Sequence, residues 1–127
     1  MATVLIVDDD PHARLLMRTL LAHAGHIALE AVGGVEGLAS TTQYQPDLIL
    51  MDLSMPGMSG PEFVRALRAD QRTCHSRVAL YTASPIDDAM RDFMAIYGIA
   101  SALPKPSEPV ELLAAIERAL SVPAGSY

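Results

Sequence analysis

The sequence is poor in three features that would point to other classes of protein. It has a single cysteine, Cys74, which cannot form an internal disulfide, so a reducing compartment fits this usage. No apolar stretch approaches the ~18 residues of a membrane span, and the amino terminus lacks the organisation of a signal peptide. Basic residues are outnumbered 9 to 15 by acidic ones, and the net charge of −6 offers no basic surface for nucleic acid. We therefore expect a cytoplasmic protein that binds neither membrane nor nucleic acid.

The sequence does contain ample material for a hydrophobic core. Half of the 127 residues are hydrophobic and 19% are charged, which is typical of a soluble globular protein. This length suits one domain with its own core. We expect a folded domain over residues 1–121 and a carboxy-terminal tail or linker over residues 122–127.

Short apolar runs alternate with helical patterns five times along the chain. Most of the runs are continuous, which is typical of strands covered on both faces. We place strands at about residues 4–7, 27–31, 48–52, 78–81 and 99–103, and helices at about residues 11–24, 35–43, 60–69, 85–97 and 108–120. This order predicts an α/β fold with a parallel sheet, right-handed crossovers and helices on both faces.

The helical patterns also predict where helices begin and which residues they bury. Asp10 before Pro11 is typical of a helix start, and Ser59 with Glu62 forms a capping box. We expect Ser84 with Pro85 to start the fourth helix, and Ser107 with Pro109 to start the last. The residues we place on the buried faces are Leu16, Leu20 and Ala24 in the first helix, and Leu113, Ile116 and Leu120 in the last.

Polar side chains follow four of the expected strands. The acids Asp8, Asp9 and Asp10 follow the first strand, Asp52 ends the third, and Thr82 and Lys105 follow the fourth and fifth. The carboxyl ends of parallel strands meet at one edge, where such folds have their functional crevice. Clustered carboxylates need a positive partner, which a hard cation such as Mg²⁺ or the Lys105 ammonium can supply. An aspartate placed there can act as a nucleophile toward phosphorus.

Simpler interpretations exist for each of these acids. We interpret Asp10 as the cap of the first helix and not as a metal ligand. Asp8 and Asp9 could be solvated loop acids, and Asp52 could cap a turn, but their positions after apolar strands favour a site. The four histidines are scattered and show no paired spacing for a metal.

The residues in this order resemble a known family over nearly the whole chain. The segments VLIVDDDP, LILMD, MPGMSG, YTAS and LPKP together resemble the receiver domain of bacterial two-component response regulators. The resemblance implies a flavodoxin-like, doubly wound (βα)5 fold with strand order 2-1-3-4-5. It also implies a cis peptide between Lys105 and Pro106.

The resemblance implies a function and a division of labour among the site residues. Asp52 would accept a phosphoryl group from the phosphohistidine of a histidine kinase or of a histidine phosphotransfer protein. Asp8, Asp9, Asp52 and the backbone carbonyl of Ser54 would hold Mg²⁺ or Mn²⁺. Thr82 and Lys105 would contact the phosphoryl group. Phosphorylation would switch a surface of the fourth helix, fifth strand and last helix, which binds a downstream protein or a second copy.

One departure from the family keeps other functions open. Family members often carry an aromatic residue three positions before the lysine, where this chain has Ala102. A binding module that signals without phosphorylation is therefore an alternative. A third alternative, a phosphohydrolase with an aspartate nucleophile, is disfavoured because Ser54, and not a second acid, lies two residues after Asp52. We thus expect a signalling phosphoacceptor and not an enzyme.

Overall fold

The structure, a computed structural model, describes residues 1–122. Residues 123–127 of the expected tail lie outside the described residues. Strands and helices alternate five times, as the sequence predicted. The elements are β1 (Thr3–Val7), α1 (Pro11–His23), β2 (Ile27–Ala31), α2 (Gly34–Tyr44), β3 (Leu48–Met51), α3 (Gly60–Ala69), β4 (Val78–Thr82), α4 (Asp88–Tyr97), β5 (Ile99–Pro104) and α5 (Pro109–Ser121).

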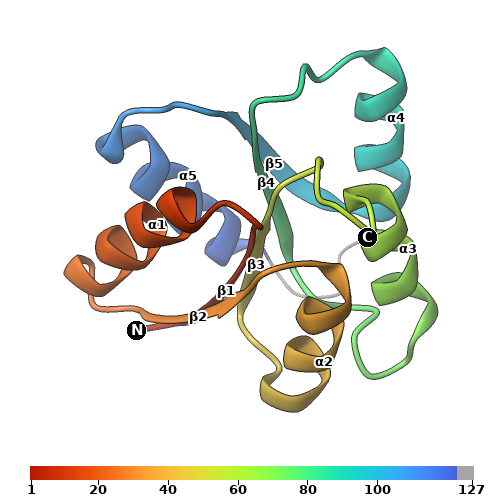
Figure 1. Cartoon of the computed structure of the whole chain (residues 1–127), viewed down its shortest axis with the longest axis horizontal. Coiled ribbons are helices and arrows are strands. Elements are labelled where there is room, and N and C mark those ends of the chain that lie inside the picture. Colours follow the sequence, from red (N-terminus) through yellow and green to blue (C-terminus); the bar gives the residue numbers. More distant parts are fainter. Residues whose placement is uncertain (123–127) are drawn as a thin grey trace.

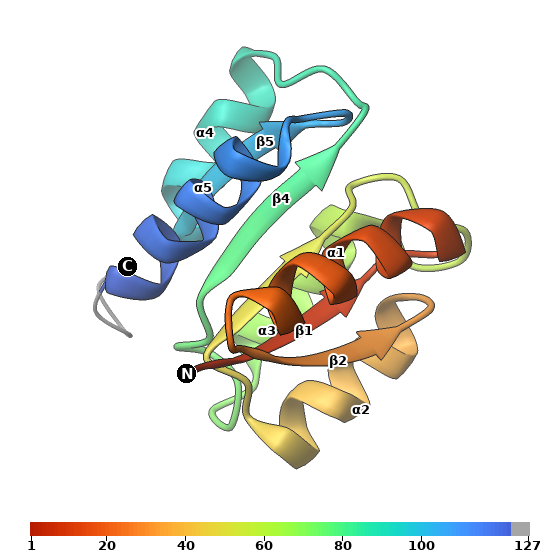
Figure 2. The ribbon, with the colours of Figure 1, turned by 90° about the vertical axis from the view of Figure 1, so that its left-hand side faces the viewer.

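The five strands form one parallel sheet in the order β2-β1-β3-β4-β5. This confirms the flavodoxin-like α/β fold and the strand order that the resemblance implied. Helices α1 and α5 cover one face of the sheet, and α2, α3 and α4 cover the other (Figure 1). Because all strands run the same way, their carboxyl ends meet at a single edge (Figure 2). That edge is where the residues singled out from the sequence lie.

Two hydrophobic clusters, one on each side of the sheet, make up the core. Strand residues alternate between them: Leu5 and Val7 of β1 pack in one cluster, and Val4 and Ile6 in the other. All four are buried, because each side of the sheet is covered by helices. This explains why the apolar runs are continuous in the sequence. The sheet therefore forms a rigid support for the loops at its edge.

Local capping signals set most helix ends, and two caps differ from the prediction. Asp10 caps α1 by accepting a hydrogen bond from the His12 amide, and the capping box of Ser59 and Glu62 is present. The predicted start of α4 at Ser84 is wrong, and Ser107 does not cap α5, although Pro109 begins that helix as predicted. The N-cap of α4 is Asp87, three residues later, and Ser107 donates its hydroxyl to the Pro104 carbonyl, so that α5 begins after Glu108. Ser84 lies in the loop before α4, and Ser107 stabilises the loop before α5.

The predicted buried faces of α1 and α5 are also partly wrong. In α1 the buried residues are Met17 and Leu21, and in α5 they are Leu112, Ala115, Ile116 and Ala119. Ile116 was predicted correctly. Both helices contain consecutive apolar residues, such as Leu15-Leu16-Met17, so several faces have similar hydrophobicity. A shift of one residue rotates a helix by about 100°, and only packing against the sheet selects the face.

Arg68, near the carboxyl end of α3, ties α4 to the rest of the domain. Its guanidinium donates to the carbonyl oxygens of Tyr97 and Gly98, at the end of α4, and to those of Cys74 and Ser76, before β4. No residue of α4 is fully buried. The carbonyls at a helix end lack partners within the helix, and a cation there also suits the helix dipole. Arg68 therefore anchors one end of a helix whose core-facing residues are only partly buried.

Candidate functional site

Four of the predicted site residues lie at the carboxyl edge of four neighbouring strands. Asp8 directly follows β1, Asp52 directly follows β3, and Thr82 is the last residue of β4. Lys105 directly follows β5, and its amide donates to the Thr82 carbonyl at 2.9 Å. Asp8, Asp52 and Thr82 are all buried, at 4%, 9% and 2% exposure. Strand pairing thus brings together residues that lie far apart in the sequence.

The Lys105 ammonium bridges the two buried carboxylates. Its Nζ atom lies 2.6 Å from Oδ2 of Asp8 and 3.0 Å from Oδ2 of Asp52. The other carboxylate oxygens accept from loop amides, Oδ1 of Asp8 from the Asp10 amide at 2.9 Å and Oδ1 of Asp52 from the Ser54 amide at 3.2 Å. Each carboxylate is thus held at both oxygens. Such pairing is what allows buried carboxylates to stay charged.

This pairing sets the charge state of Lys105, the only lysine in the sequence. Burial by itself lowers the pKa of a lysine, since it disfavours the charged form. The hydrogen bonds that the ammonium donates to Asp8 and Asp52 outweigh burial and hold the pKa of Lys105 above its ordinary value. The crevice therefore contains a permanent cation at neutral pH, next to the residue that the sequence predicted as the phosphoacceptor.

Asp9 completes a group of acids suited to a hard metal ion. Carboxylate oxygens of Asp8, Asp9 and Asp52 all lie within 4.8 Å of one another, and Asp9 is exposed while the other two are buried. An all-oxygen set open to water on one side is the kind that Mg²⁺ and Mn²⁺ bind, because these ions keep several water ligands. The residues present therefore fit a divalent cation. Asp10, by contrast, uses its side chain to cap α1, as predicted.

Two loops lie next to each other beside this acidic group. The Thr82 oxygen accepts from the Ser84 amide at 3.1 Å, and the Ser84 hydroxyl lies 3.4 Å from that of Ser54 in the β3–α3 loop. A hydroxyl can accept one hydrogen bond and donate another, so Thr82 retains the ability to donate. The role of the Ser54 carbonyl as a metal ligand stays a prediction. The peptide between Lys105 and Pro106 is cis, as the resemblance implied.

Two residues near the site were missed by reasoning from the sequence. Arg14 of α1 donates to the Asp8 carbonyl at 2.7 Å and pairs with Glu30 of β2, which fixes the β1–α1 loop. The ring of Tyr81, directly before Thr82, lies below the Lys105 ammonium. The single aromatic residue in the aliphatic run of β4 was a usable signal. For Arg14 no signal exists, because charged residues on exposed helix positions are common.

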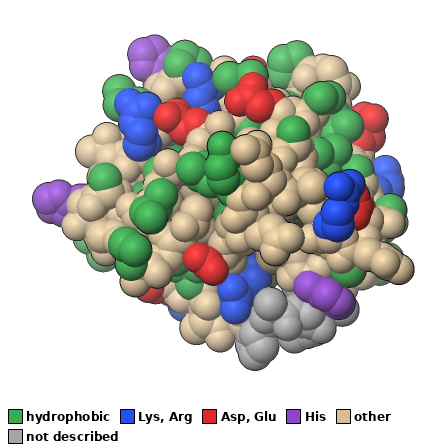
Figure 3. Space-filling model, turned by 90° about the horizontal axis from the view of Figure 1, so that it is seen from below, with side chains coloured by type: hydrophobic (Ala, Val, Ile, Leu, Met, Phe, Trp, Pro, Cys, Tyr) green, Lys and Arg blue, Asp and Glu red, His purple; other side chains and the backbone are tan. Residues whose placement is uncertain are grey.

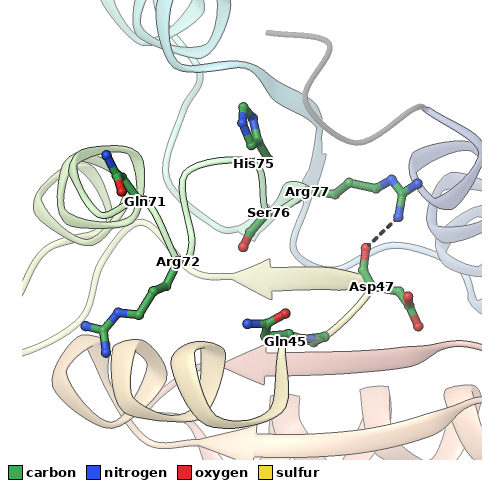
Figure 4. A pocket seen from close by; sticks show the side chains of 8 residues that line it. Gln45, Asp47, Gln71, Arg72, His75, Ser76 and Arg77 are labelled. Atoms are coloured by element: carbon green, nitrogen blue, oxygen red, sulfur yellow. Dashed lines mark hydrogen bonds between the residues drawn. The ribbon is translucent and has the colours of Figure 1, made fainter.

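A hollow of about 240 Å³ lies at the opposite edge of the sheet. It is lined by Gln45, Pro46, Asp47, Gln71, Arg72, His75, Ser76 and Arg77. The guanidinium groups of Arg72 and Arg77 point in opposite directions (Figure 4). Arg72 pairs with Asp70, and Arg77 donates to the carbonyls of Asp47 and Val122. The two arginines that line this hollow therefore make structural contacts and do not point toward a common ligand, unlike the groups in the acidic crevice.

The surface on the side of α2 carries hydrophobic side chains in small groups among polar and charged ones (Figure 3). Val32, just before this helix, and Val35, in its first turn, are 52% and 73% exposed. Small exposed apolar groups of this kind are ordinary on soluble domains. Among the helices described in residues 1–122, none is long and apolar enough to cross a membrane. The acidic crevice is thus the feature that distinguishes this molecule.

Comparison with known proteins places the chain in a family. Residues 4–117 match the family described as "Response regulator receiver domain". The chain is 37% identical over 121 residues to the "DNA-binding dual master transcriptional regulator RpaA" of Synechocystis sp., with 94% of this chain and 49% of RpaA covered. It is 34% identical over 113 residues to the "Hybrid signal transduction histidine kinase D" of Dictyostelium discoideum, covering 89% of this chain and 7% of the kinase.

A similar solved structure is that of the chemotaxis protein CheY4 of Vibrio cholerae. It has a TM-score of 0.86 and 31% identity, and the match covers 94% of this chain and 98% of CheY4. The chain therefore belongs to the response regulator receiver domains of two-component signalling, which are in general signalling modules and not enzymes. It spans about half the length of the first curated relatives, 49% and 51%.

Proposed function

We propose that this chain is a phosphoacceptor receiver domain and that Asp52 is the residue that becomes phosphorylated. The observation that carries the proposal is the arrangement around Asp52. Its carboxylate lies beside Asp8 and Asp9, and the Lys105 ammonium bonds it at 3.0 Å. A nucleophilic carboxylate flanked by a cation and further acids suits phosphoryl transfer, where positioning and charge neutralisation dominate catalysis.

The proposed reaction transfers a phosphoryl group from a phosphohistidine to Asp52. A carboxylate oxygen of Asp52 attacks phosphorus, the P–N bond to the donor imidazole breaks, and the imidazole retains the electron pair. Asp8, Asp9, Asp52 and the Ser54 carbonyl would hold Mg²⁺ or Mn²⁺, which would supply positive charge to the phosphoryl oxygens when bound. Lys105 moves from Asp52 Oδ2 to a phosphoryl oxygen, and the Thr82 hydroxyl donates to another.

The partner that fits this chemistry is a histidine kinase or a histidine phosphotransfer protein. We propose that the receiver domain covers residues 1–121, that it acts in the cytoplasm, and that phosphorylation alters the surface of α4, β5 and α5. That surface would then bind a downstream protein or a second copy. Helix α4 buries no residue fully, which supports this choice of surface.

The proposal is tested with acetyl phosphate as a small phosphodonor in Mg²⁺. Intact mass should show one added phosphoryl group on the wild type, and none on Asp52→Asn or in the presence of a chelator. Asp10→Asn is the matched control. It also removes one carboxylate of the run Asp8-Asp9-Asp10, but Asp10 caps α1 and is not a site residue. An adduct of undiminished yield on Asp52→Asn would refute the assignment.

Ala102 favours a second candidate, a binding module whose surface does not respond to phosphorylation. Ala102 packs against the same core cluster as Phe93 and Tyr97 of α4, whose ring centroids are 4.5 Å apart. Amide NMR spectra with and without acetyl phosphate distinguish the two candidates. Shifts that spread over α4, β5 and α5 support the switch, whereas shifts confined to the crevice support the binding module.

A further inference from the structure

The Lys105 ammonium has a third neighbour besides the two carboxylates. Its Nζ atom lies 5.4 Å from the centroid of the Tyr81 ring. This is within the ~6 Å range in which the negative face of an aromatic ring attracts a cation. The Tyr81 residue is 5% exposed and the Lys105 side chain 16% exposed, so the contact is largely shielded from water. Such shielding strengthens the attraction.

The sheet holds the Tyr81 ring in this position. Tyr81 is the residue before Thr82 in β4, and successive side chains of a strand point to opposite faces. Its ring packs in the core cluster on the side of α1 and α5, and its partner in the register of β5 is Leu103. The hydrogen bond from the Lys105 amide to the Thr82 carbonyl fixes the loop that carries the lysine. Ring and ammonium are thus set by the same pair of strands.

We propose that Tyr81 is a positioning residue that keeps the Lys105 ammonium in the crevice during phosphoryl transfer. This inference rests on the proposed function. In the resting state Asp8 and Asp52 hold the ammonium, but in the reaction both would also hold the metal ion and Asp52 attacks phosphorus. The ring is uncharged, so it neither binds the metal nor reacts. The attraction of the ring for the ammonium therefore matters most in the transition state, when both carboxylates have other partners. An interaction that is stronger in the transition state than in the resting state lowers the activation barrier.

The first test measures the rate of phosphorylation by acetyl phosphate in Mg²⁺. Tyr81→Leu, which removes the ring and keeps an apolar side chain, should slow the rate roughly 3- to 10-fold, the size of a partly shielded cation–π contact. Tyr81→Phe, which keeps the ring, should restore the rate to within about twofold of the wild type. If Tyr81→Leu does not fold, as judged by circular dichroism, Tyr81→Met replaces it, because methionine fills irregular space. Equal rates for Tyr81→Leu and the wild type overturn the proposal.

The second test needs no phosphorylation. Because Lys105 is the only lysine, the Nζ signal of a ¹⁵N-lysine sample reports on it alone. The ammonium protons should exchange with water at similar rates in the wild type and Tyr81→Phe, and at least about 3-fold faster in Tyr81→Leu. A slowed reaction with unchanged exchange assigns Tyr81 a packing role only and overturns the proposal. If the wild type accepts no phosphoryl group, the proposed function fails, and the exchange rates alone decide whether the ring holds the ammonium.

Discussion

Replacing Lys105 by methionine should destabilise the domain strongly when no divalent cation is present. The substitution keeps most of the apolar stem but leaves the carboxylates of Asp8 and Asp52 buried beside each other without their cation. Removing one partner of a buried ion pair costs about 3–5 kcal/mol. Lys105 is 16% exposed, and water can reach the crevice, so we expect about 2–4 kcal/mol. For a domain of this size the unfolding midpoint should fall by roughly 8–15 °C.

The assay is thermal and urea unfolding, followed by circular dichroism, with a chelator and then with Mg²⁺. A divalent ion replaces the missing positive charge, so Mg²⁺ should stabilise Lys105→Met more than the wild type. An ion at about 100 times its dissociation constant stabilises the folded state by about 2.7 kcal/mol. The control is Arg91→Met, which removes a cation from an exposed pair with Asp88 and should leave the midpoint close to that of the wild type.

The same comparison at different pH values tests the charge of Lys105. Its folded pKa is held above the ordinary value of 10.5 by Asp8 and Asp52, despite burial. A group whose pKa is raised on folding stabilises the protein fully below its unfolded pKa and loses that contribution as the pH rises through its folded pKa. The wild type should therefore keep its advantage over Lys105→Met near pH 7 and lose it only above about 10.5. Equal stability of the two proteins at pH 7 in chelator, or equal stabilisation by Mg²⁺, would refute the reasoning.

Three further predictions follow from single contacts. Arg68→Met should lower the free energy of unfolding by about 2–4 kcal/mol, because several carbonyls lose a charged donor, and should speed amide exchange at the end of α4. Gly60→Ala should cost about 1–3 kcal/mol in urea unfolding, since an added Cβ would lie 2.8 Å from the backbone of Leu53, which cannot move aside. Asp10→Ala should lose about 1 kcal/mol of stability and still bind Mg²⁺ in calorimetry, whereas Asp9→Ala should lose Mg²⁺ affinity and keep its stability. The reverse pattern for these two acids would contradict the division between cap and ligand.

Much of the site could be predicted because strand ends are visible in the sequence. Asp8 and Asp52 each follow a continuous apolar run, and in a parallel sheet such positions meet at one edge. The start of α4 could not be predicted as well, because a serine before a proline, here Ser84 before Pro85, is compatible with both a cap and a loop. In the structure Asp87 accepts from the Met90 amide and so caps α4, a choice that depends on how far the preceding loop must extend.

The sequence by itself determined the alternation of strands and helices, the residue types at the strand ends and, through them, the acidic crevice. These follow from local hydrophobicity and capping, which act between residues near in the chain. Only the tertiary structure decided that Lys105 bonds both Asp8, 97 residues away, and Asp52, 53 residues away, and that the Tyr81 ring lies against the same ammonium. Such contacts depend on strand order and register, because a change in either would move these side chains to other neighbours or to the opposite face of the sheet.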